Sequence, residues 1–297
     1  MSAFRLLASS FLVPASALAL AAAFVSPAVR EPVARLDLAP PAAQDEGFEE
    51  ASARITILPD LTAPPAAKTA AAADPFAMQA ERKMRAEAAA ARLEARLTPE
   101  MRKYFGLFLY VSKADEGPLA QHMMVFKKGQ HGHLQLAYDW LASTGRERAE
   151  VNARGRPVLT ATPGGYYELD PGRMYRRYRS FSWDQEMPHA MFFNWQRAGN
   201  PTGLAIHAAS GDDVTKLGSR ASAGCVHLSP DNAATLYALI RADYRGRVPR
   251  LAVDTDTGTS SNHGRFMYSR SGEIKTIAGY RVLVMIEDYS GEDEALL

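Results

Sequence analysis

The feature that most constrains the fold is a series of short apolar and aromatic segments that begins near residue 105. Stretches containing glycine, proline or other polar turn residues separate these segments, a pattern typical of β-strands. The expected strands are residues 105–111, 122–127, 134–141, 166–169, 203–207, 247–253 and 279–288. One helix is expected at 229–241, where apolar residues recur at helical spacing after a Ser-Pro start. Strands and helices do not alternate, so the sequence predicts a mainly β barrel or sandwich.

The N-terminal region predicts an exported protein. Residues 1–28 have the features of a secretory signal: a positive charge at Arg5, an apolar stretch over 6–25, and small residues suited to cleavage. An uncleaved membrane anchor is the alternative, since about 20 apolar residues can span a bilayer. Residues 29–73 are rich in alanine and proline, which predicts a disordered linker. The expected location is the periplasm or cell envelope.

A charged helix is expected over residues 74–98. Asp74 can cap it, Pro75 suits the first helical position, and the residues that follow are strong helix formers. Because apolar residues are sparse among the charges, we expect a solvated helix leading into the domain; a coiled-coil partner helix is the alternative.

Composition excludes several classes of function. The net charge of +1 argues against a nucleic-acid binder that neutralises phosphates. The single cysteine among 297 residues excludes an internal disulfide framework. His131 and His133 have no cysteine or carboxylate cluster beside them, so a solvated turn is the better interpretation than a metal site. No metal or organic cofactor is predicted.

The lone cysteine, Cys225, lies in a segment that suggests chemistry. Ser222 and Gly224 precede it and predict a tight turn that exposes the sulfur, while His207 lies 18 positions upstream in a predicted strand. A thiol with its ordinary pKa near 8.5 is a weak nucleophile at neutral pH until a neighbouring imidazole removes its proton or lowers that pKa. Cys225 and His207 are therefore candidates for nucleophile and base, although a lone cysteine can also be a buried small apolar residue.

This pattern resembles the signature of the L,D-transpeptidase (YkuD) family. A histidine, a spacer of fourteen residues, and Ser222-x-Gly224-Cys225 agree with that signature. Two positions depart from it, because Ala223 stands where the family usually has histidine, and His227 where arginine or asparagine is common. The resemblance implies a catalytic domain over 99–297, with its core at 104–254, an insertion at 255–276 and a last strand at 279–288. The implied fold is an L,D-transpeptidase-like β-barrel or sandwich with one helix after the cysteine.

The resemblance also implies roles for individual residues. Cys225 would be the nucleophile and His207 the base, oriented by a backbone carbonyl near Ala208. Backbone N–H groups of Gly224, Cys225 and Ala223 would bind the oxyanion. The expected substrate-binding residues are Ser222, His227, His189 and Phe193. The start of the helix after Cys225 would favour the thiolate if the sulfur points toward it.

Two further segments have a sequence pattern that predicts structure but no catalytic role. Residues 171–182 alternate arginines with tyrosines, which indicates a solvated face first and a groove for an acidic peptide or glycan second. The Thr-Pro-Gly-Gly sequence at 162–165 predicts a tight turn, and that structural role is enough to explain it.

The function implied by the resemblance is peptidoglycan L,D-transpeptidation, in the context of cell-wall organisation and cell shape. The partners would be peptidoglycan stem peptides, with an envelope protein as an alternative acceptor; nucleic acid is not expected, and a membrane only if the signal stays uncleaved. Two alternatives stay open at this point: a hydrolase of the same fold that cleaves peptidoglycan cross-links or peptidoglycan–protein bonds, and a non-catalytic wall-binding module.

Overall fold

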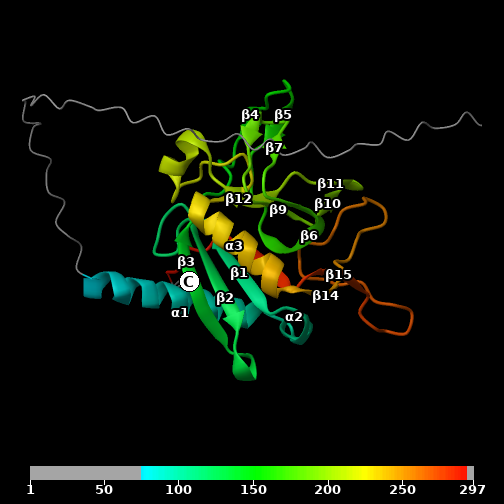
Figure 1. Ribbon diagram of the computed structural model, residues 1–297. Helices are drawn as coiled ribbons and strands as arrows, with labels where there is room; N and C mark the ends of the chain where they lie inside the picture. Colours follow the sequence, from blue (N-terminus) through cyan, green and yellow to red (C-terminus); the bar gives the residue numbers. More distant parts are fainter. Residues whose placement is uncertain (1–74, 293–297) are drawn as a thin grey trace, which may run out of the picture. The chain divides into compact units, whose positions relative to one another are not determined.

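Eight strands pair into one sheet (Figure 1), and most of the expected strands belong to it. The computed structural model describes residues 75–292, so the proposed signal (1–28) and linker (29–73) lie outside the described residues. The strands of the sheet are β1 (Leu107–Ser112), β2 (His122–Lys128), β3 (Leu134–Leu141), β6 (Gly165–Tyr175), β9 (Ala190–Phe193), β12 (Ala205–Ala208), β13 (Val226–Leu228) and β16 (Val282–Glu287). Their spatial order is β13-β12-β9-β6-β16-β1-β2-β3.

Smaller elements surround this sheet. The two-stranded pairs are β4 (Ala149–Val151) with β5 (Pro157–Leu159), β7 (Arg179–Ser180) with β8 (Gln185–Glu186), β10 (Gln196–Arg197) with β11 (Asn200–Pro201), and β14 (Arg245–Pro249) with β15 (Thr276–Tyr280). The α-helices are α1 (Pro75–Arg96), α2 (Pro99–Tyr104) and α3 (Pro230–Asp243), and short 3₁₀ turns occur at Gln130–Gly132 and Gly211–Lys216. Within residues 75–292, no helix has the length and apolarity needed to cross a membrane.

The two ends of the sheet meet beside the segment that contains the cysteine. Ser143, just past the end of β3, bridges to His227 in β13, and their backbone N–H groups donate to each other's carbonyls over 3.0 and 2.8 Å. The sheet is therefore a nearly closed barrel, and the prediction of a mainly β fold is confirmed. This closure fixes the backbone two residues after Cys225.

Strand β1 is buried on both sides, because side chains alternate between two apolar clusters. Leu107, Leu109 and Val111 join the cluster that α3 packs against, while Phe108 and Tyr110 join the cluster covered by α1. The uninterrupted apolar run of the sequence is explained by this double burial.

Helix α1 packs against the sheet, which corrects the expectation of a solvated helix. Ala89 and Leu93 lie four residues apart on one face of the helix, Leu97 follows directly after its last residue, and all three are buried. Arg85 pairs with Asp139 of β3 at 3.0 Å, so charged residues also join the helix to the sheet. The buried stripe was hidden in the sequence because alanine forms part of it and its other apolar residues are few.

The last expected strand, 279–288, is in fact two strands. Residues Thr276–Tyr280 form β15 and pair with β14, whereas Val282–Glu287 form β16 and pair in parallel with β1. The strand expected at 247–253 ends at Pro249. The polar insertion expected at 255–276 belongs to the long connection between β14 and β15.

Glu168 in β6 is a buried carboxyl group whose oxygens make no hydrogen bond of normal geometry among the described residues. Burial raises its pKa to about 8, and the neighbouring Asn194 side chain offsets part of this rise. The folded-state pKa lies above the ordinary value of 4.5, so the folded protein binds the proton more tightly than the unfolded chain.

We therefore expect the free energy of unfolding to fall as pH rises from about 4.5 to about 8, by roughly 2–5 kcal/mol from this one group. The Glu168→Gln variant should lose that dependence and exceed the wild type in stability at pH 8. Urea unfolding across this pH range measures the slope, with Glu273→Gln on the surface as the control. Equal slopes in all three proteins would contradict the prediction.

Candidate active site

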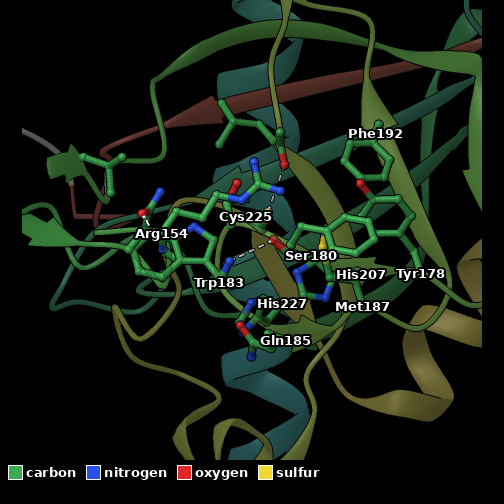
Figure 2. Close-up of a pocket in the computed structure, with 17 residues that line it drawn as sticks. Arg154, Tyr178, Ser180, Trp183, Gln185, Met187, Phe192, His207, Cys225 and His227 are labelled. Carbon is green, nitrogen blue, oxygen red and sulfur yellow. Dashed lines mark hydrogen bonds between the residues drawn. The ribbon is translucent and has the colours of Figure 1, made fainter. Parts of the chain in front are cut away.

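Cys225 and His207 both line one cavity of about 420 Å³ at one end of the sheet. Figure 2 shows its lining residues, which come from β12 and β13, from the β4–β5 hairpin, and from the segment that contains β7 and β8. The Cys225 thiol is half-buried and donates to the Gly203 carbonyl, with 3.5 Å between sulfur and oxygen. The cavity therefore contains the nucleophile and base candidates together.

Parallel pairing of β12 and β13 brings two histidines into contact. His207 and His227 are partners in register, and their ring centroids are 4.5 Å apart. The Nδ1 atom of His207 lies 2.8 Å from the Ala208 carbonyl oxygen. Because a carbonyl can only accept, Nδ1 carries the proton, and Nε2 keeps the lone pair that a general base requires.

Burial keeps all three groups neutral near pH 7. Desolvation lowers the pKa of His207 to about 3, with a further contribution from His227. Desolvation also lowers the pKa of His227 to about 4. The thiol of Cys225 has its pKa raised to about 11 by burial, partly offset by a hydrogen bond from the Ala205 backbone. At rest the cavity thus contains a neutral thiol and a neutral imidazole, so a base at His207 would have to take the proton as the sulfur reacts.

The start of α3 does not support the thiolate, contrary to the sequence expectation. Strand β13 separates Cys225 from Ser229, which caps the helix through the Asn232 N–H. At about 3.3 Å per residue, this strand places the helix start more than 10 Å from the cysteine along the chain. A helix terminus acts only over its last turn, which agrees with the raised pKa of the thiol.

The turn before Cys225 is held by side chains within it. The Ser222 hydroxyl donates to the Cys225 carbonyl and accepts from the Gly224 N–H at 3.0 Å. Gly224 has φ +120°, and a Cβ there would lie 2.8 Å from the Ala161 carbonyl oxygen, so only glycine fits. Because the Gly224 N–H already donates to the Ser222 hydroxyl, the candidate oxyanion donors are the N–H groups of Ala223 and Cys225.

Comparison with known proteins identifies the family of the chain. The family model of the L,D-transpeptidase catalytic domain (YkuD) matches residues 111–261, which is half of the chain. The chain belongs to this family.

Several solved structures are similar to the chain at low identity. An L,D-transpeptidase from Stackebrandtia nassauensis is 18% identical over 45% of this chain and 50% of its own, with a TM-score of 0.31. An L,D-transpeptidase from Xylanimonas cellulosilytica is 17% identical over 66% of this chain and 68% of its own, with a TM-score of 0.34. The helical cell shape determining protein Pgp2 from Campylobacter jejuni is 13% identical over 70% of this chain and 55% of its own, with a TM-score of 0.33. The chain spans about half the length of the first of these structures, and no curated protein matches it.

In this L,D-transpeptidase domain, the two departures from the family signature occupy different places. Ala223 lines the cavity, so a small apolar group stands where the signature has an imidazole. His227 also lines the cavity, and its Nδ1 is buried without a hydrogen-bond partner among the described residues. The imidazole that contacts His207 thus comes from β13 and not from the turn before Cys225.

Three of the expected substrate-binding residues have other positions. Ser222 is fully buried and holds the turn. Phe193 stacks on Tyr167 in the core with ring centroids 4.8 Å apart, because strand alternation turns its neighbour Phe192 toward the cavity instead. His189 packs against Tyr237 of α3 and is not among the residues lining the cavity.

The sequence interpretation missed most of the cavity wall. Tyr178, Phe181, Trp183 and Gln185 line it, together with Asn152, Arg154 and Val158 of the β4–β5 hairpin. The basic–aromatic run at 171–182 contributes one aromatic part of this wall, because the ring centroids of Tyr178 and Phe192 are 5.0 Å apart. Arg173 and Arg179 of the same run instead form ion pairs with acidic residues. The hairpin had no distinctive motif that marked it.

Thr162 is a positioning residue that the sequence interpretation treated as part of a simple turn. Its hydroxyl donates to the Gly224 carbonyl and accepts from the Gly145 N–H, both at 2.8 Å. It therefore ties the turn before Cys225 to a neighbouring backbone segment.

Replacing Thr162 with valine keeps the volume but leaves a buried N–H and a buried carbonyl without partners. We expect a loss of about 1–3 kcal/mol in unfolding free energy and about a tenfold loss of activity. Thermal unfolding and acylation rates of Thr162→Val and Thr162→Ser measure both effects. Because serine keeps the hydroxyl, it should restore most of the activity; a serine variant as slow as the valine variant would contradict the assignment.

The reactivity of the thiol should also report its environment. With a pKa near 11, Cys225 should react with iodoacetamide at a rate that keeps rising from pH 7 to pH 10. Turnover should persist down to about pH 4, because the base becomes protonated only near pH 3. Mass spectrometry of the alkylated protein gives the rate, and a rate that is already constant from pH 7 to pH 10 would reveal a thiolate–imidazolium pair instead.

Proposed function

We propose that this protein is a peptidoglycan L,D-transpeptidase with Cys225 as nucleophile and His207 as general base. The observation that carries the proposal is the juxtaposition of the thiol with an imidazole whose Nδ1 is fixed by the Ala208 carbonyl, in one cavity. Family membership gives the reaction class, and the geometry supports these roles.

The donor in this proposal is a tetrapeptide stem. His207 Nε2 takes the thiol proton as the sulfur attacks the carbonyl carbon of the third, diamino-acid residue. The Ala223 and Cys225 N–H groups stabilise the resulting oxyanion. Collapse breaks the peptide bond, and the protonated His207 returns its proton to the departing amine of D-alanine. A thioester remains on Cys225.

An amine then completes the transfer. It attacks the thioester carbonyl, His207 accepts the proton from the amine, and the thiol is regenerated when that proton passes to the sulfur. An amine from another stem gives a cross-link, and the N-terminus of a protein gives an anchored envelope protein. We propose that residues 1–28 direct export to the envelope, where these substrates occur, and that residues 29–73 separate the catalytic domain from that signal.

The experiment is mass spectrometry of tetrapeptide-stem muropeptides after incubation with the purified protein and with Cys225→Ala. Dimers joined through two diamino acids, absent with the variant, support the proposal. Tripeptides alone would favour the hydrolase, since water can attack the same thioester. Binding to peptidoglycan without any conversion by the wild type would favour a wall-binding module and overturn the proposal.

A further inference from the structure

Arg154 is the charged member of the cavity wall. Among the described residues that line the cavity, none is an aspartate or a glutamate, and the two histidines are neutral at pH 7. The Arg154 side chain extends into the cavity from the β4–β5 hairpin (Figure 2). The cavity that contains Cys225 therefore has a net positive charge, which favours an anionic ligand.

The guanidinium of Arg154 makes no ion pair or hydrogen bond with the part of the chain that the structure describes, unlike those of three other arginines near the cavity. Arg146 and Arg148 both bind Glu150, and Arg173 binds Asp170. These three arginines are thus neutralised by acidic partners, while Arg154 lines the cavity with its five N–H donors available.

The backbone that carries Arg154 is fixed. The Asn152 side-chain oxygen accepts from the N–H groups of Arg154 and Arg156, each at 3.0 Å. The Ala153 N–H donates to the carbonyl of Ser182, another lining residue, at 2.9 Å, which ties the hairpin to the segment between β7 and β8. An unpaired guanidinium on an ordered turn is suited to bind a ligand, because little backbone entropy is lost on binding.

We propose that Arg154 is a specificity-determining residue that binds a carboxylate of the donor peptide while Cys225 attacks. This inference rests on the proposed function and names the charge that the site selects. A guanidinium binds a carboxylate through two parallel N–H···O bonds, so it fixes the orientation of the donor as well as its charge. The donor has two candidate groups: the terminal carboxylate of the leaving amino acid, and a side-chain carboxylate where the diamino acid is dicarboxylic.

The test compares Arg154→Met with Arg156→Met. Arg156 lies on the same turn and is exposed, but it does not line the cavity, so it controls for charge and for the hairpin. The donors are a tetrapeptide with both carboxylates, one with a terminal amide, one with lysine in place of the dicarboxylic residue, and one with both changes. Release of the leaving amino acid gives kcat/KM for each pair.

We expect Arg154→Met to lower kcat/KM at least about tenfold on the donor with both carboxylates, and Arg156→Met to change it less than twofold. The penalty should disappear on whichever donor lacks the carboxylate that Arg154 binds, which identifies the group. Arg154→Lys should recover part of the loss, since it keeps the charge without the fork. A penalty that is the same on all four donors, or the same in both methionine variants, would overturn the inference.

Binding separates this inference from the proposed reaction. In the Cys225→Ala background, titration calorimetry of the same four peptides measures affinity without turnover. The wild type could be inactive on every donor while Arg154→Met still weakens binding only of peptides that carry one particular carboxylate. In that case the proposed reaction is wrong, and carboxylate binding by Arg154 is supported. An absence of peptide binding in this background would overturn the recognition as well.

Discussion

Replacing Cys225 with alanine is expected to abolish acyl transfer, with a loss of at least about 10⁴-fold, because no other thiol exists in the chain and no thioester can form. Intact-mass measurement after incubation with a carbapenem provides the direct readout. The wild type should gain the mass of one lactam, by analogy with attack on the stem carbonyl, and Cys225→Ala should gain none.

The alanine variant should remain folded. The sulfur is half-buried and its hydrogen bond to the Gly203 carbonyl is long, at 3.5 Å, so removing it leaves a small gap at the cavity surface. The melting temperature and the affinity for stem peptide should therefore change little. Residual cross-linking by a folded Cys225→Ala protein would show that another group is the nucleophile.

Replacing His207 with asparagine should lower kcat by about 10²–10⁴-fold, the usual contribution of a general base. Asparagine can keep the donor bond to the Ala208 carbonyl, but it has no basic atom in the place of Nε2. Single-turnover acylation, followed by release of the leaving amino acid, isolates the step in which the base acts. The loss should appear in this step and not in peptide affinity.

His227 makes this test informative, because its ring contacts that of His207 in the same cavity. His227→Asn should slow acylation less than His207→Asn, since no backbone carbonyl fixes the Nδ1 of His227. His133→Asn in the exposed turn serves as the control for a histidine remote from the site. A larger loss in His227→Asn than in His207→Asn would exchange the roles of the two residues.

Local information in the sequence was sufficient for several of the strands and for the helix that follows Cys225. Residues 134–141 form a strand with the expected bounds, and the helix after Cys225 begins at Pro230 as its Ser-Pro start indicates. The pairing of His207 with Cys225 was expected from the resemblance of their spacing to the family signature, and both residues line one cavity. These features depend on side-chain alternation, capping and the conformational freedom of glycine, all of which act over a few residues.

The tertiary structure decided which other residues surround that pair. Arg154 and Tyr178 reach the cavity from separate segments of the chain, and no periodicity relates them to Cys225. Phe192 lines the cavity in place of the expected Phe193, because the core covers the face of β9 that carries Phe193. The burial of α1 depended on a sheet assembled from distant segments. The neutral state of the thiol likewise follows from desolvation by the whole fold. Sequence patterns are local, whereas burial and the convergence of side chains arise only when distant segments pack together.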